Sequence, residues 1–205
     1  MTRRTRIAAV PLALLLPLVA PQAGTTQAVS KPPHAAARSA NKTGSAKDPA
    51  DDTYFYFGDV VPPDLRSATV RLSAGTGMSL TTRFSPGTFS AASTAVHFTF
   101  YTKAPSEPSE CGDYLVNFNT AGAPKGQVLV RRRTHGTEYQ DVGKGAVKVI
   151  TDGLQLTVPA KAFGEDLSRL THWHVVVAIR LRDDAESRIL DYLPDTSLPV
   201  ATLGP

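Results

Sequence analysis

A period of two in the side chains of residues 172–182 constrains the fold of this chain more than any other feature. One face of this stretch is apolar and contains Trp173, Val175, Val177, Ile179 and Leu181. The opposite face carries imidazole and guanidinium groups. Such alternation is typical of a β-strand with one buried face. Residues 65–72, 96–101, 113–119 and 154–158 repeat the pattern, and no segment keeps a helical period, so the sequence predicts an all-β fold.

Turn-forming residues separate these stretches at short intervals. Examples are Gly75-Thr76-Gly77, Ser85-Pro86-Gly87 and Asp152-Gly153. Many short strands joined by such turns are typical of an antiparallel β-sandwich, here expected to be jelly-roll-like. Residues 159–164 begin with proline and end with glycine, which predicts one short helical turn within the domain.

The first residues have the character of an export signal. Arg3, Arg4 and Arg6 precede an uncharged apolar stretch, residues 7–20, and small residues follow up to Ala28. We therefore expect residues 1–28 to be a secretory signal peptide that leaves no membrane span once removed, and the mature protein to be secreted. The Thr2-Arg3-Arg4 start keeps a twin-arginine route open beside ordinary Sec export.

Composition divides the remaining chain into a tail and one domain. Residues 29–47 are rich in Ala, Ser, Pro and Lys and are expected to form a disordered tail or linker. Residues 48–205 are expected to form the β-sandwich domain. Cys111 is the one cysteine of the chain, so no internal disulfide can form and a free thiol is expected. We expect a monomer.

The formal charge of +4 does not describe the domain. Seven of the 22 Lys and Arg precede residue 48, whereas all 18 Asp and Glu follow residue 47, so the domain carries −3. This balance argues against a nucleic-acid partner. The run from Arg131 to Arg133 is interpreted as a solvated edge strand that blocks edge pairing.

Two groups of side chains could hold a metal ion. Aspartates gather in the expected loops, where hard oxygen ligands suit calcium, although aspartate is also a common turn former. His172 and His174 lie two apart on one strand and share a face with each other. Together with His97 they could form a zinc or copper site only if the two strands are neighbours.

The sequence contains none of the motifs that mark common catalytic centres. It lacks a Gly-x-Ser-x-Gly elbow, a His-Glu-x-x-His helix and a glycine-rich phosphate loop. Paired carboxylates could still hydrolyse a glycoside, so a secreted glycoside-acting hydrolase remains the alternative to a non-catalytic binding module.

Several segments, taken in order, resemble the DOMON-like β-sandwich superfamily, which includes the family-nine carbohydrate-binding modules and the haem-binding DOMON domains. The segments are residues 48–52, 64–70, 112–116, 158–164, 173–176 and 191–195. The resemblance implies a secreted accessory module without catalysis. It also implies a structural calcium ion, which would fall on Asp48, Asp52 and Asp113.

The resemblance and the missing catalytic motifs together predict a module that binds carbohydrate or another cell-surface ligand. The expected ligand-binding residues are exposed rings that stack on sugars, Tyr54, Tyr56 and Tyr101, supported by Asn117 and Asn119. The haem-binding members suggest a further alternative, a haem or redox domain.

Overall fold

The computed structural model describes residues 41–48, 61–73, 75–107, 110–120, 126–180, 187–194 and 200–205. These residues form eleven strands and two short 3-10 helices: β1 (Lys42–Lys47), β2 (Leu65–Ser73), β3 (Gly77–Phe84), β4 (Thr94–Tyr101), β5 (Tyr114–Phe118), β6 (Val128–His135), β7 (Glu138–Ile150), β8 (Gly153–Pro159), η1 (Ala160–Ala162), η2 (Gly164–Arg169), β9 (His172–Arg180), β10 (Ser187–Leu193) and β11 (Ala201–Thr202). All their strand pairings are antiparallel. The predicted all-β fold class is confirmed.

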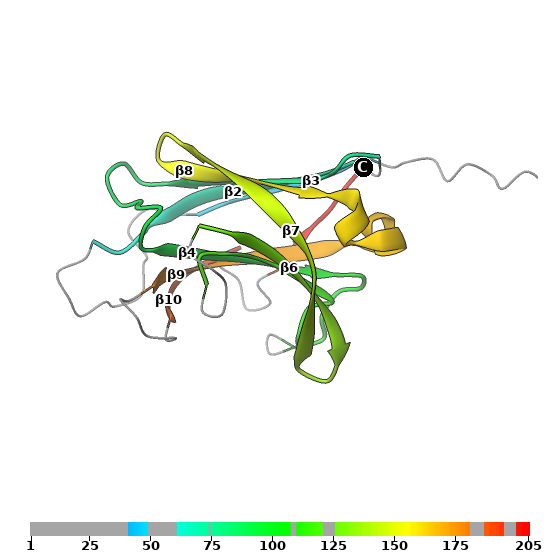
Figure 1. The fold of residues 1–205 in the computed structure, drawn as a ribbon. Helices are drawn as coiled ribbons and strands as arrows, with labels where there is room; N and C mark the ends of the chain where they lie inside the picture. Colours follow the sequence, from blue (N-terminus) through cyan, green and yellow to red (C-terminus); the bar gives the residue numbers. More distant parts are fainter. Residues whose placement is uncertain are drawn as a thin grey trace, which may run out of the picture. The chain divides into compact units, whose positions relative to one another are not determined.

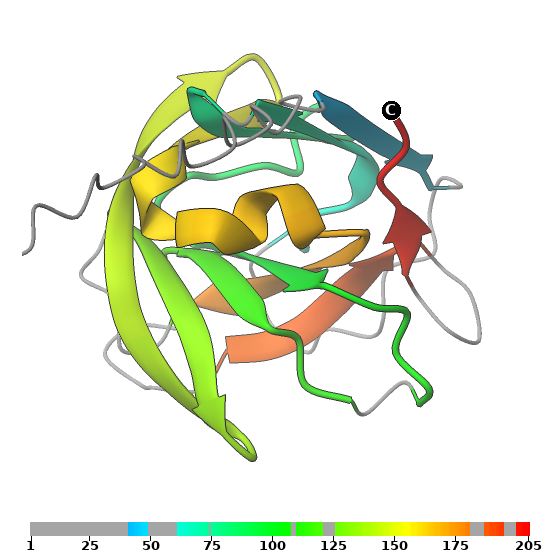
Figure 2. The same cartoon turned by 90° about the vertical axis from the view of Figure 1, so that its right-hand side faces the viewer.

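The strands form two packed layers that share one long strand. Hydrogen-bonded neighbours follow the order β1-β2-β3-β8-β7-β6-β5-β4-β9-β10. Strand β7 is 13 residues long and pairs with β6 through its first part and with β8 through its last part, so it passes from one layer to the other (Figure 1). At the opposite margin, β11 pairs with β9 while Gly204 bridges to Thr43 of β1, and the sheet is nearly closed (Figure 2).

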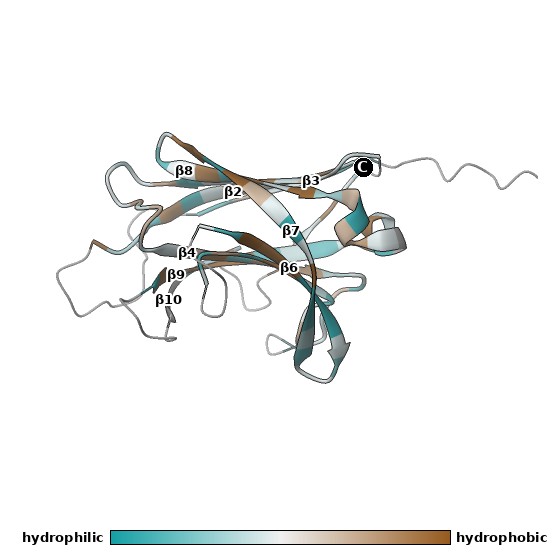
Figure 3. Cartoon of the chain, in the orientation of Figure 1, coloured by the Kyte–Doolittle hydropathy of each residue, from teal (hydrophilic) through white to brown (hydrophobic). Residues whose placement is uncertain are grey.

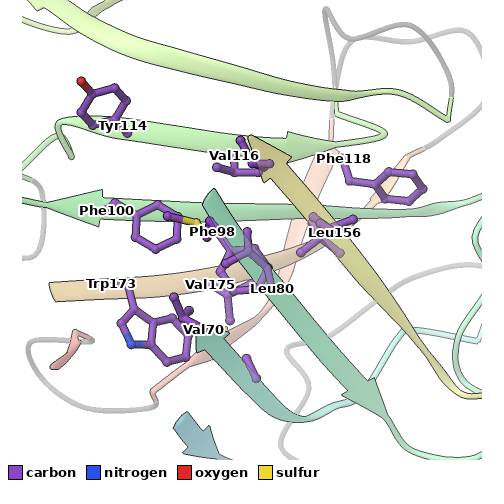
Figure 4. Close-up of a cluster of buried hydrophobic side chains, with 14 of the residues drawn as sticks. Val70, Leu80, Phe98, Phe100, Tyr114, Val116, Phe118, Leu156, Trp173 and Val175 are labelled. Carbon is purple, nitrogen blue, oxygen red and sulfur yellow. The ribbon is translucent and has the colours of Figure 1, made fainter. Parts of the chain in front are cut away.

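The core lies between the layers and follows the alternation in the sequence. Apolar and polar residues succeed each other along the strands (Figure 3). In β9, Trp173, Val175 and Val177 are fully buried, as predicted. They meet side chains from β2, β3, β4, β5 and β8 (Figure 4). Each fully buried side chain of this size contributes about 1.5–3 kcal/mol, so this core holds the domain together without a disulfide.

The expected helical turn is present. Pro159 precedes η1, and a second 3-10 helix, η2, continues from Gly164. In the view of Figure 2, the two helices lie across one end of the domain, between the two layers. Phe163, Leu167 and Leu170 are buried there against the core, so the helical segment closes one end of the sheet and presents its polar side chains outward.

The prediction of a disordered tail over residues 29–47 is wrong for residues 42–47, because these form β1. The sequence of this segment has no apolar alternation that would indicate a strand, because β1 is held by backbone pairing with β2. Its one fully packed position is Gly44, which lies against Trp173. A Cβ atom there would lie 2.4 Å from Nε1 of Trp173, so the indole ring of β9 fits only under a glycine.

The rest of the N-terminal part lies outside the described residues, including the expected signal peptide, residues 1–28. Asp52, Tyr54 and Tyr56 also lie outside them. In the part of the chain that the structure does describe, no helix has the length and apolar character needed to cross a membrane.

Candidate functional site

Tyr101 is not the exposed ring that the sequence suggested. It is only 4% exposed, and its hydroxyl group lies 3.2 Å from Nδ1 of His174 and donates to the carbonyl oxygen of Glu110. Burial raises the pKa of Tyr101 to about 12, and the neighbouring Cys111 and Glu110 add to the effect. The prediction of exposure is wrong because the segment at Glu110, which follows β4 along the chain, and the ring of His174 on β9 pack against Tyr101.

The two asparagines predicted to meet a ligand are also buried. Asn119 has a left-handed backbone with φ of 54° where β5 ends, and it is fully buried. Its amide group donates to the carbonyl oxygen of Thr94 at 3.2 Å, while Arg180 donates to its Oδ1 at 3.1 Å. Asn117 is 2% exposed and lies opposite His97 across the β4–β5 pair. Asn119 therefore ties strands together rather than facing solvent.

Of the expected calcium ligands, Asp48 and Asp113 have different surroundings, and Asp52 lies outside the described residues. The carboxylate of Asp113 accepts hydrogen bonds from the backbone and hydroxyl groups of Thr102, both at 2.7 Å, and from Arg133 at 3.0 Å. Burial acts to raise the pKa of Asp113, but these donors outweigh it, so the pKa lies below its usual value. Asp48 is buried at the end of β1, where its backbone NH donates to Arg66. Among described residues, no three His, Cys, Asp or Glu form a metal-binding group.

The histidines share a face, as the alternation indicated. Strands β4 and β9 are neighbours, and His97 and His174 lie on the same side of them. Burial lowers the pKa of each imidazole from 6.5 to about 4, and each cation that would form is further disfavoured, that of His97 by Arg131 and that of His174 by His97. His172 lies further along, opposite Tyr101. The zinc or copper site therefore does not assemble within the described residues.

A polar cleft lies where η2 faces the ends of β5 and β6. It consists of two adjoining hollows of about 220 and 440 Å³, which share Tyr114, Arg132 and Asp166. The smaller hollow is also lined by Asp113, Arg133 and Arg169, and the larger one by Val142, Lys161, Ala162, Phe163 and Gly164. Four cationic side chains therefore face two carboxylates, which leaves the cleft with an excess of positive charge.

Asp166 is the centre of the cleft's hydrogen bonding. Its Oδ2 accepts a hydrogen bond of 2.5 Å from the Tyr114 hydroxyl and lies 3.3 Å from Nη2 of Arg132. Nη1 of Arg169 lies 3.5 Å from its Oδ1. The side chains of Arg132 and Arg169 are 58% and 71% exposed, so both guanidinium groups can also reach a ligand from solvent. Such an arrangement suits a carboxylate, sulfate or phosphate group.

The arginine run contributes to this cleft in a way that the sequence did not indicate. Strand β6 lies between β5 and β7, so the interpretation of residues 131–133 as an edge strand is wrong. Alternation separates the three side chains. Arg131 pairs with Asp141 at 2.8 Å and Arg133 with Asp113, while Arg132 turns to the other face, over the ring of Tyr114 at 5.9 Å.

Lys161, Asp166 and Arg169 were not identified from the sequence. They lie in and next to the helical segment, far along the chain from Arg132, and only the packing of η2 against the sheet brings them to it.

No family model matches this chain, and no curated protein or solved structure matches it either.

Proposed function

We propose that this chain is a secreted, non-catalytic binding module whose cleft binds a carbohydrate that carries an acidic group. The observation that carries the proposal is the positive excess of the cleft, where Arg132, Arg169 and Lys161 are available beside Asp166. Guanidinium groups bind carboxylate and sulfate oxygens in pairs, and the remaining polar lining can accept and donate hydrogen bonds to hydroxyl groups.

The cleft favours an acidic ligand over a neutral one. Neutral sugars are commonly held by stacking on an exposed aromatic ring, but Tyr114 is 1% exposed and its ring lies beneath Arg132. Recognition in the cleft must therefore depend on charge and hydrogen bonds. Contacts of this kind, made in an open cleft, support modest affinity that salt weakens.

The state of Asp113 supports binding rather than glycoside hydrolysis. A hydrolase needs one carboxyl group that stays protonated near neutral pH, and such groups have a raised pKa. The pKa of Asp113 is lowered, and its oxygens are engaged by Thr102 and Arg133. A haem domain finds no support from Met78, which is 2% exposed and part of the core.

The test is a calorimetric or NMR titration with digalacturonate, using its methyl ester as the uncharged control. Digalacturonate should bind and the methyl ester should not. Arg169→Gln should weaken binding at least about fivefold, since it removes one charge from the cleft. Lys103→Gln, which removes a charge from an exposed side chain outside the cleft lining, should leave the affinity unchanged.

Three results would contradict the proposal. Equal binding of the acid and the ester, or equal affinity of both variants, would remove the cleft as an anion site. Release of reducing ends from the oligomer or from a polysaccharide would show that the protein is a hydrolase.

A further inference from the structure

The outward face of the layer formed by β1, β2, β3, β8 and the end of β7 has an unusual composition. The strand registers arrange its side chains in three rows that cross the sheet: Lys47, Ser67, Arg83, Gly153 and Ile150; Ser45, Thr69, Thr81, Gln155 and Lys148; and Thr43, Arg71, Ser79, Thr157 and Ala146. We call these positions the hydroxyl face. Most of them are Ser, Thr or basic residues.

The hydroxyl face carries charge of one sign only. Its charged residues are Lys47, Arg71, Arg83 and Lys148, and all four are exposed. The strand segments that build it, residues 42–47, 65–73, 77–84, 146–150 and 153–159, contain no Asp or Glu. The domain as a whole has more acidic than basic residues, so this gathering of cations on one face is not a consequence of overall charge.

The cations of this face are available to a partner. Within the described part of the chain, none of the ion pairs involves Lys47, Arg71 or Lys148. Arg83 donates to the carbonyl oxygen of Thr151 at 2.6 Å and keeps its charge. Between the cations, hydroxyl groups stand at regular intervals, because neighbouring strands are about 4.8 Å apart and outward residues about 7 Å apart along a strand.

We infer that the hydroxyl face binds an anionic polysaccharide laid across the strands. Arg71 on β2 and Lys148 on β7 are separated by three strand spacings, or about 14 Å, which exceeds the length of one sugar ring. Acidic groups along the chain pair with the cations, and the Ser and Thr hydroxyl groups between them hydrogen-bond to sugar hydroxyls. This surface is separate from the cleft, so the inference does not depend on the proposed function.

The chemistry of the face favours a polysaccharide over a membrane surface. Proteins that lie on lipid bilayers insert apolar or aromatic side chains next to their cations. The hydroxyl face includes no aromatic residue, and its hydrocarbon side chains are only Ala146 and the half-buried Ile150 at its margin. Hydroxyl groups between cations match a hydroxylated polyanion instead.

The experiment measures binding of the full chain to polygalacturonate, to its methyl ester and to phosphatidylglycerol vesicles at two salt concentrations. Polygalacturonate should bind, and binding should weaken with salt. The double variant Arg71→Gln with Lys148→Gln, which breaks no ion pair among the described residues, should bind at least about tenfold more weakly. Thr69→Val with Thr81→Val keeps every charge and should weaken binding about threefold, which separates hydroxyl recognition from charge alone.

The polymer measurements are made in the background of the cleft variant Arg169→Gln, so that polygalacturonate held by the cleft does not mask the loss at the hydroxyl face. Melting temperatures confirm that each variant is folded. Unchanged polymer binding by the folded double variant would overturn the inference, and so would tighter binding of vesicles than of polygalacturonate. Failure of the cleft shows only in the digalacturonate titration, so the two proposals fail separately.

Discussion

Two half-buried imidazoles should make this protein lose stability in mild acid. His97 and His174 lie on neighbouring strands, no carboxylate of the described residues stabilises either imidazolium, and burial lowers both pKa values from 6.5 to about 4. Asn117 partly offsets this for His97, since its side chain would accept a hydrogen bond from the imidazolium. Between the folded-state pKa of about 4 and the ordinary pKa of 6.5, the unfolded chain binds protons that the folded chain excludes.

The direction and size of the effect follow from proton linkage. Since the unfolded state binds more protons, the free energy of unfolding falls as pH decreases from 6.5 toward 4 and changes little above 6.5. A shift of this size corresponds to about 3 kcal/mol per imidazole when the window is crossed completely. Because both groups are partly exposed and interact with each other, we expect a combined loss of about 2–4 kcal/mol.

The effect is measured by urea unfolding, with Trp173 fluorescence as the signal. Measurements at intervals from about pH 7 to about pH 4.5 cover the range where histidines titrate. The double variant His97→Gln with His174→Gln should remove most of the slope. His135→Gln, in the exposed end of β6, should keep it. The lowered pKa of Asp113 does not interfere, because its contribution is lost only below its usual pKa of 3.8. Equal slopes in the native protein and the double variant would refute the reasoning.

Three further predictions concern the core and the ions. Gly44→Ala should destabilise the domain by about 1–3 kcal/mol because its Cβ meets Trp173, whereas Gly75→Ala, with nothing within 4 Å, should not; melting temperatures decide between them. Trp173→Ala should cost about 3–5 kcal/mol in denaturant unfolding through lost burial and a cavity. If calcium binds through Asp48 and Asp52, its addition should raise the melting temperature relative to EGTA. Asp113→Asn should lower the melting temperature equally in both conditions, because Thr102 and Arg133 hold its carboxylate.

The core strands could be predicted because each has its own alternation of apolar and polar residues. The alternation of residues 172–180 places Trp173 and Val175 inside whatever the neighbouring strand is, since side chains of a strand point to opposite faces. The helical turn at 159–164 was equally local, because Pro159 and Gly164 mark its ends. Strand β1 was missed because Gly44 and its neighbours contribute almost no apolar surface, and their pairing depends on a partner elsewhere in the chain.

The outward positions were harder to interpret. Alternation correctly separated the two faces of β4 and β5, but it could not show that Tyr101 and Asn117 lie in the interior of a sheet and are covered. The same limit applied to Arg132, whose strand was taken for an edge. Whether an outward side chain meets solvent depends on the strand's neighbours, and those are decided by contacts between residues far apart in sequence.

The sequence by itself determined the all-β class, the inward residues of the main strands and the lack of a disulfide, because periodicity and composition are local properties. Tertiary structure alone decided which charges meet. Pairing of β2, β3, β8 and β7 aligns Arg71 with Thr157 and Thr81 with Gln155 on one acid-free face, and packing of η2 brings Asp166 to Arg132. These are non-local contacts whose energy depends on distance in space, which the order of residues along the chain does not contain.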